Sequence, residues 1–236
     1  MRICLLTTET PHHAYFAQTL VADGHDVLTL AEHKRVSPPY ETAHHFETER
    51  DIFECEAWFN GRQVQLADVA DTRSFEDINA PESIKLLASH SPDICITFGT
   101  GRLRSEIIAA GGDHLLNLHG GDPEQYRGLD THLWAIWHRD FYALSTCLHR
   151  VATGLDTGDI LACLPIDIRP DAALHQLRKA NTETCVTLAR LAIHQLESTG
   201  HLLTRPQRQS GRYYSFMPAA LKSVCIEHFA RYTGSL

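Results

Sequence analysis

Short apolar runs alternate with amphipathic stretches along the first half of the chain. The runs have the length of strands, and the stretches between them place apolar residues at the spacing of one buried helical face. The apolar runs lie at 2–8, 27–30, 93–98 and 115–119, and the amphipathic stretches lie at 11–23 and 81–90. Because strands that alternate with helices are typical of α/β proteins, the pattern predicts a Rossmann-like, mostly parallel sheet flanked by helices.

The second half of the chain predicts one short helix, two strands and one long helix. The short helix is expected at 131–137 and the strands at 144–151 and 160–168. Asp171 is expected to cap the long helix, and from there apolar residues recur with a helical period over roughly eight turns, until Gly200. We expect a single catalytic domain over residues 1–200, with a C-terminal extension over 201–236 that packs on the domain or in a dimer contact.

The stretch between Ala31 and Asp77 is irregular and acidic, and its pattern predicts little. Only residues 63–66 are predicted there as a strand. No regular helix is predicted around His44 and His45, although Glu41 and Glu49 lie nearby.

Composition narrows the class of protein. The chain has 236 residues, of which 43% are hydrophobic, enough for one sizeable core. Its 21 basic and 29 acidic residues give a net charge of −8, which disfavours a nucleic-acid partner. No apolar run approaches the roughly 18 residues of a membrane span, and the first residues do not resemble a secretion signal. We therefore expect a soluble cytoplasmic protein with no membrane partner.

Cysteines and histidines do not indicate a metal site. The seven cysteines are odd in number and widely separated, which is typical of reduced core residues in a cytoplasmic protein. None of them has the C-x2-C spacing of a structural zinc site. The sixteen histidines include no H-E-x-x-H pair, so no metal is expected.

The strand at 115–119 ends in two polar residues, Asn117 and His119. Since side chains alternate along a strand, both must point to the same side of the sheet. Gly120 and Gly121 follow, where the backbone can turn sharply or approach a ligand closely. Ligands bind at the carboxyl ends of strands in open α/β sheets, so an amide and an imidazole are expected side by side at a binding site.

A glycine-flanked loop at 154–159 supplies a carboxylate, Asp156, that can reach His119. A carboxylate beside an imidazole stabilises its charged form, and an amide such as that of Asn117 can donate to an oxyanion. Taken singly, each of these residues is more often a turn former or a packed side chain. Together they suit attack on a carbonyl group with proton transfer.

These residues resemble the folate-dependent formyltransferase family, in which a strand ends in N-x-H, a loop with Pro and Arg-Gly follows, and a D-x-G loop supplies the acid. The resemblance covers residues 93–165. The matching positions are Asn117, His119, Pro123, Tyr126, Arg127, Gly128, Trp134, Ala135, Ile136, Thr146, His149 and residues 154–161. It implies the fold of the methionyl-tRNA and glycinamide ribonucleotide formyltransferases, and the chain is most similar to the short sugar N-formyltransferases.

The resemblance implies N10-formyltetrahydrofolate as co-substrate and a primary amine as formyl acceptor, without a metal. It implies that the Asn117 amide and a protonated His119 hold the oxyanion, while Asp156 orients His119 and, with a water, relays the amine proton. The implied donor contacts are Gly101, Arg102, Leu103, Gly154 and Leu155, with Tyr126 and Arg127 shaping the donor or the acceptor side.

The two ends of the chain resemble short members that formylate a nucleotide-linked amino sugar. For such an acceptor the expected contacts are His12, His13 and Tyr15, with Lys34 and Arg35 as cations for a diphosphate. The tail aromatics either stack on a base or cover an apolar face or a contact of a possible homodimer. These aromatics are Tyr213, Tyr214 and Phe216.

The chain departs from the transfer-RNA enzymes at two places. Residues 120–123 read Gly-Gly-Asp-Pro where those relatives have Ser-Leu-Leu-Pro, and too few residues follow Gly200 for their RNA-binding domain. The same polar groups are also compatible with an amino acid or another small amine as acceptor, or with a hydrolase that releases formate from the same folate. A binding or regulatory protein is disfavoured, because all three polar groups are present.

Overall fold

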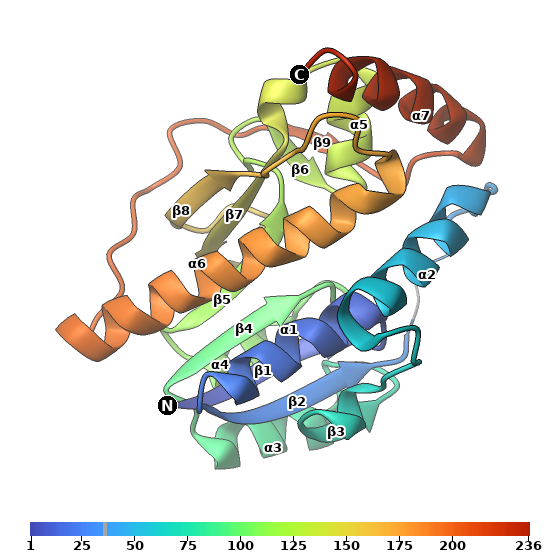
Figure 1. The fold of residues 1–236 in the computed structure, drawn as a ribbon. Coiled ribbons are helices and arrows are strands. Elements are labelled where there is room, and N and C mark those ends of the chain that lie inside the picture. Colours follow the sequence, from blue (N-terminus) through green and yellow to red (C-terminus); the bar gives the residue numbers. More distant parts are fainter. Residues whose placement is uncertain (35–36) are drawn as a thin grey trace.

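The computed structural model describes residues 1–34 and 37–236 and contains a mostly parallel sheet (Figure 1). Within these ranges the strand order is β3-β2-β1-β4-β5-β7-β8. The strands are β1 (Arg2–Thr8), β2 (Asp26–Glu32), β3 (Asp71–Phe75), β4 (Ile94–Phe98), β5 (Leu115–Gly120), β7 (Ser145–Arg150) and β8 (Ile160–Pro165). The first five strands are parallel to one another, and β7 runs antiparallel to both of its neighbours, β5 and β8. The predicted α/β fold class is confirmed.

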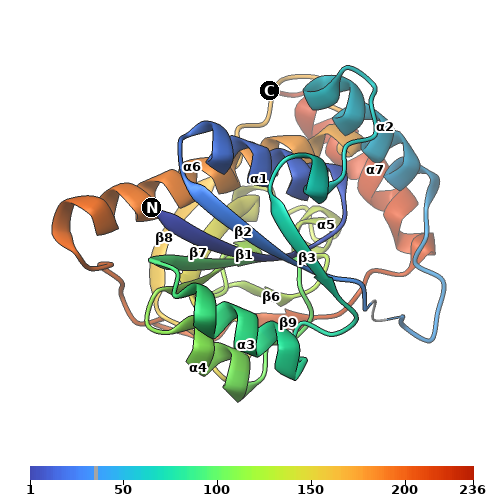
Figure 2. The ribbon, with the colours of Figure 1, turned by 90° about the horizontal axis from the view of Figure 1, so that it is seen from below.

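Helices cover both faces of the sheet (Figure 2). On one face lie α1 (Pro11–Ala22) and α6 (Leu177–Thr199), with α2 (His45–Phe59) beside them. On the other face lie α3 (Pro81–His90) and α4 (Ser105–Gly111). The central strands β1 and β4 read as continuous apolar runs because both of their faces are buried. None of the described helices is long and apolar enough to cross a membrane.

A second core lies beyond the antiparallel end of the sheet. It joins α5 (Thr131–Trp137) and α7 (Ala219–Thr233), which pack against each other around the fully buried Phe229. Beside it, β6 (Tyr126–Gly128) pairs with β9 (Arg212–Tyr214) in a two-stranded sheet. This core takes residues from both sides of Gly200, and the domain boundary expected there stays a prediction.

The stretch before β3 differs from the sequence-based expectation. The strand predicted at 63–66 is wrong: Leu66 is fully buried and begins a short 3-10 turn, η1 (Leu66–Asp68). The strand of this region is β3, which lies at the edge of the sheet and is mostly exposed. Its mostly polar sequence contains no apolar run from which a strand could be predicted, because an edge strand has few residues to bury.

Helix α2 was not predicted, and the long helix begins later than expected. The His44 ring accepts the Phe46 N–H while the Glu47 carboxylate accepts the His44 N–H, which caps the start of α2. Asp171, expected to cap the long helix, instead has a left-handed backbone with φ of 55°. The chain then passes through η3 (Leu174–Gln176) before α6, while η2 (Phe141–Ala143) leads into β7.

The C-terminal helix is fastened to the start of α2 through Lys222, which is 2% exposed. Its ammonium donates to the Thr42 carbonyl at 2.6 Å and to the Glu47 carboxylate at 2.9 Å. A buried ammonium is stabilised only while such partners remain in place.

We expect Lys222→Met to lower the free energy of unfolding by about 2–4 kcal/mol, because the Glu47 carboxylate and the Thr42 carbonyl lose their donor. Lys179→Met is the matched control, since Lys179 forms an exposed pair with Glu183 and should cost less than about 1 kcal/mol. Urea unfolding of the two variants measures the difference. Equal costs would contradict the role assigned to Lys222.

Candidate active site

The predicted polar residues converge at the carboxyl end of β5. His119 Nδ1 lies 3.7 Å from Asp156 Oδ1, and Asn117 is joined to the same carboxylate through His149. The Asn117 amide donates to His149 Nε2 at 3.1 Å, and that nitrogen lies 3.8 Å from Asp156 Oδ1. His119, His149 and Asp156 are each less than a tenth exposed. The Asp156 carboxylate therefore faces the imidazoles of His119 and His149, and His149 connects it to the Asn117 amide.

The hydrogen-bond partners of His119 determine its tautomer. Its Nε2 lies 2.8 Å from the Tyr126 carbonyl oxygen, and since a carbonyl can only accept, Nε2 carries the hydrogen. This leaves Nδ1, on the side of Asp156, to gain or lose a proton. The remaining carboxylate oxygen of Asp156, Oδ2, accepts the Gly128 N–H at 2.8 Å.

The position of Gly128 depends on its being glycine. Its φ is 95°, and a Cβ there would lie 2.0 Å from the Tyr214 carbonyl oxygen. A side chain would therefore push β6 away from β9 and remove the N–H that binds Asp156.

His149 is a site residue to which the sequence analysis assigned no role. It stands opposite Asn117 in the antiparallel pair β5–β7, so the two side chains share a face. Its Nδ1–H donates to the Arg150 carbonyl at 2.8 Å, which leaves Nε2 as the acceptor for Asn117. Burial, followed by the proximity of His119, lowers the pKa of His149 to about 4. A neutral His149 thus orients the amide. The T-x-x-H pattern at 146–149 was the available signal.

The two loops expected to hold the folate donor meet through Arg102, whose guanidinium donates to the Thr153 carbonyl at 3.0 Å. The backbone N–H of Gly101 is already bound by the buried Glu32 carboxylate at 2.7 Å. Leu103 is 8% exposed and belongs to the core under α3 and α4, whereas Leu155 is 39% exposed. Glu32 therefore fixes the Gly101 loop. Gly101, Arg102, Gly154 and Leu155 are accessible, whereas Leu103 is buried.

Tyr126 and Arg127 do not direct their side chains as expected. The Tyr126 ring is buried in the second core, stacks on Tyr214 and donates its hydroxyl hydrogen to Asp140. The Arg127 guanidinium donates to Ser210 at 2.6 Å. The Tyr126 carbonyl group, and not its ring, meets His119, and the donor or acceptor role predicted for Tyr126 and Arg127 stays a prediction.

His12 and His13 lie where β1 and β4 end, packed edge-on against Phe98. His13 Nδ1 lies 2.8 Å from the Thr8 carbonyl, and burial lowers the pKa of His13 to about 3. Burial also lowers the pKa of His12. Both rings are therefore neutral near pH 7 and cannot supply the charge that a diphosphate needs.

The other residues expected to bind the acceptor have partners of their own. Tyr15 stacks on Trp58 with 4.2 Å between ring centroids. Lys34 is paired with Asp77 at 3.0 Å, and Arg35 lies outside the described residues.

Two adjoining hollows of about 270 and 340 Å³ open beside Pro11, between the start of α1 and α2. Their walls carry carboxylates and no described basic side chain, which makes them unfavourable for a phosphate group. The carboxylates belong to Glu9, Asp51, Glu56 and Asp68. Among residues 1–34 and 37–236, no group of three or more His, Cys, Asp or Glu side chains is placed to hold a metal ion.

The sequence profile of the formyl transferase family matches residues 8–188. The chain belongs to this family, whose members are enzymes that transfer one-carbon groups.

Solved structures share the fold. A sugar N-formyltransferase from Shewanella sp is 12% identical with a TM-score of 0.60, over 91% of this chain and 76% of that one. The formyltransferase PseJ from Anoxybacillus kamchatkensis, solved with a UDP-linked formamido sugar and tetrahydrofolate, is 16% identical with a TM-score of 0.52, over 91% and 86%. A HypX variant from Aquifex aeolicus is 18% identical with a TM-score of 0.58, over 94% of this chain, which spans 32% of HypX.

Buried neutral histidines make the stability depend on pH. Burial lowers the pKa of His132 to about 4, as it does for His149 and more strongly for His13. Below the ordinary histidine pKa of about 6.5, the unfolded chain binds these protons and the folded chain does not. The free energy of unfolding should therefore fall as the pH drops from about 6.5 to about 4.

Urea unfolding at about pH 7.5 and about pH 5.5, above the range where most carboxylates titrate, measures this loss. His132→Gln should flatten the slope by removing one such group while keeping a donor for the Ser145 carbonyl that His132 binds. A stability that stays constant or rises toward about pH 5.5 would contradict the assignment.

Proposed function

We propose that the protein transfers a formyl group from N10-formyltetrahydrofolate to a primary amine on a small molecule. The observation that carries the proposal is the cluster of Asn117, His119, His149 and Asp156 at the carboxyl end of β5, in a chain of the formyl transferase family. A nucleotide-linked amino sugar is the first candidate acceptor. The fold shared with PseJ, whose structure holds such a sugar, supports it.

In this reaction the neutral amine attacks the formyl carbon. The C–O double bond becomes a single bond, and the formyl oxygen becomes an oxyanion. Asn117 uses one amide N–H for His149, and its second N–H is the donor offered to the oxyanion. His149 contributes by fixing the plane of that amide. Because His119 Nε2–H is held by the Tyr126 carbonyl, the oxyanion depends more on Asn117 than the family resemblance alone implies.

His119 and Asp156 carry the proton. The attacking nitrogen must lose one proton, and the folate nitrogen must gain one before the C–N bond to the donor breaks. His119 Nδ1 accepts the proton, and the imidazolium that forms is stabilised by the Asp156 carboxylate 3.7 Å away. The same proton then moves to the departing folate nitrogen, so no net charge accumulates in the buried site.

A second candidate acceptor is a small amine without phosphate, such as an amino acid. The acid-lined hollows beside Pro11 favour it, because carboxylates repel a diphosphate and attract an ammonium group. A hydrolase that releases formate would use the same residues, with water as the nucleophile.

We also propose that the enzyme works in the cytoplasm without a nucleic-acid partner. The free thiols of Cys4, Cys55, Cys95, Cys147, Cys163, Cys185 and Cys225 support a reducing compartment. The net charge of −8 opposes binding to a phosphate backbone. A homodimer, in which exposed aromatic side chains such as Tyr213 and Trp137 form the contact, completes the proposal.

We expect His119→Ala and Asp156→Asn each to lower the rate of formyl transfer at least about a hundredfold, the scale of a general acid–base contribution. Circular dichroism and thermal melting should show both variants folded. His201→Ala, at an exposed histidine that binds only its own turn, is the control and should keep the wild-type rate. Loss of activity only through unfolding would contradict the catalytic assignment.

Acceptor classes can be compared with N10-formyltetrahydrofolate labelled in the formyl group. We expect label in a nucleotide-linked amino sugar, or in an amino acid if the acid-lined hollows bind the acceptor. Free formate released equally fast with and without amine would favour the hydrolase. Turnover of methionyl transfer RNA comparable to that of any small amine would refute a small-molecule acceptor.

A further inference from the structure

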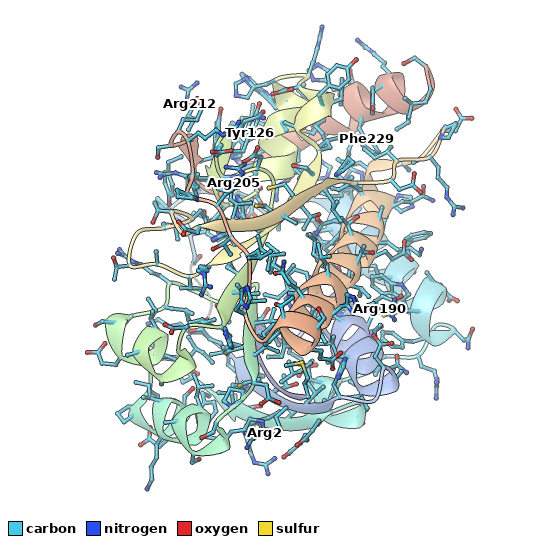
Figure 3. All side chains as sticks on the ribbon, turned by 90° about the vertical axis from the view of Figure 1, so that its left-hand side faces the viewer. Arg2, Tyr126, Arg190, Arg205, Arg212 and Phe229 are labelled. Atoms are coloured by element: carbon cyan, nitrogen blue, oxygen red, sulfur yellow. The ribbon has the colours of Figure 1, made fainter. Side chains whose placement is uncertain are left out.

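The segment 205–214 lies beyond the family-matched residues 8–188, yet it runs along the loops that form the site. Arg205 pairs with Ile160 in a β-bridge and forms an ion pair with Glu124 at 2.7 Å. Farther along, β9 pairs with β6. Figure 3 shows Arg205, Arg212 and Tyr126 grouped on one side of the molecule. The C-terminal chain is thus attached to Ile160, which follows the catalytic loop 154–159 that carries Asp156. It is also attached to β6, whose Gly128 N–H binds the Asp156 carboxylate.

The loop that carries Asp156 needs support from outside. Asp156 has a φ of 51°, a left-handed conformation that is unfavourable for residues with a side chain. Gly158 is packed against the backbone of Arg150, where a Cβ would lie 1.8 Å from the carbonyl oxygen. Within the described residues, no backbone N–H donates to the carbonyl groups of Asp156 and Gly158, so they need another donor.

Gln207 supplies the missing donors. Its side-chain nitrogen lies 2.9 Å from the Asp156 carbonyl oxygen and 2.9 Å from the Gly158 carbonyl oxygen. Because both partners can only accept, the amide must present its NH₂ end to them, with one hydrogen for each. One side chain therefore closes the two ends of the turn that holds the carboxylate.

The carboxylate itself is held from the opposite side by the same segment. Asp156 Oδ2 accepts the Gly128 N–H, and β6, to which Gly128 belongs, is held in place by β9. The Leu129 N–H donates to the Tyr214 carbonyl at 3.0 Å. With its backbone bound by Gln207 and Oδ2 bound by Gly128, Asp156 has only Oδ1 left to face His119 and His149.

We infer that Gln207 is a positioning residue for Asp156: its amide holds the 156–158 turn so that the carboxylate faces His119. Its effect on the rate rests on the proposed function, while its effect on the loop does not. The site is then completed by chain that follows the family-matched region.

The test compares Gln207→Leu with Gln209→Leu. Gln209 belongs to the same segment and donates one side-chain hydrogen bond, to the Glu124 carbonyl, and it forms no hydrogen bond to the described residues 154–158. Gln207→Glu is the second variant: it keeps the length of the side chain and has no hydrogen to donate at neutral pH.

Amide hydrogen exchange of Gly128 is the readout that does not depend on activity. We expect both Gln207 variants to speed the exchange of the Gly128 N–H at least about tenfold, because its acceptor becomes mobile. The Leu129 N–H should stay protected, since its acceptor is Tyr214. In Gln209→Leu both amides should exchange as in the wild type.

In formyl transfer, we expect the Gln207 variants to lose at least about tenfold in kcat with little change in KM, because a displaced carboxylate affects the chemical step. Unchanged Gly128 exchange would overturn the inference, as would equal loss of protection at Gly128 and Leu129, which marks general loosening of the segment. A rise in KM alone would overturn it as well. If the wild type transfers no formyl group, the proposed function fails, and the exchange result still decides the role of Gln207.

Discussion

Asn117 and His149 stand opposite each other in the antiparallel pair β5–β7, and this register decides which side chains can face the site. Residues opposed in such a pair have their side chains on the same face of the sheet. A shift by one residue would turn His149 into the core beneath α6 and leave the Asn117 amide without its acceptor. The pairing in the sheet changes from parallel to antiparallel at β5, the strand that carries Asn117 and His119.

Burial of the site determines its charges. His149 accepts the Asn117 amide only while it is neutral, and its surroundings keep it so. Asp156 faces both imidazoles and is compensated by the Gly128 N–H. Within this arrangement a proton on His119 meets the nearest carboxylate, whereas a proton on His149 would break the bond that orients the amide. Each histidine donates one N–H to a backbone carbonyl. The other ring nitrogen faces the Asp156 carboxylate in His119, whereas in His149 it also accepts the Asn117 amide.

Three separate parts of the chain build this environment. Strands β5 and β6 supply one part, the loop after β7 supplies the second, and the segment around Gln207 supplies the third. Contacts between residues so far apart in sequence form only in the folded state. Their geometry depends on the correct packing of each element. The ion pair of the buried Lys222 with Glu47 also holds α7 in place, and α7 follows the segment around Gln207.

Sequence by itself determined the α/β class and most of the central strands, and it predicted that Asn117, His119 and Asp156 lie close together. Apolar periodicity reports burial directly, and strand alternation puts Asn117 and His119 on one side. Tertiary structure alone decided the hydrogen bond between His149 and Asn117, the inward turn of Tyr126 and the neutral state of His12 and His13, since each depends on partners from other elements. It also decided α2 and β3, whose exposed surfaces leave too few apolar positions to produce a pattern. Gln207 belongs to the same group: its two acceptors lie some fifty positions earlier in the chain, and only folding brings an amide to them.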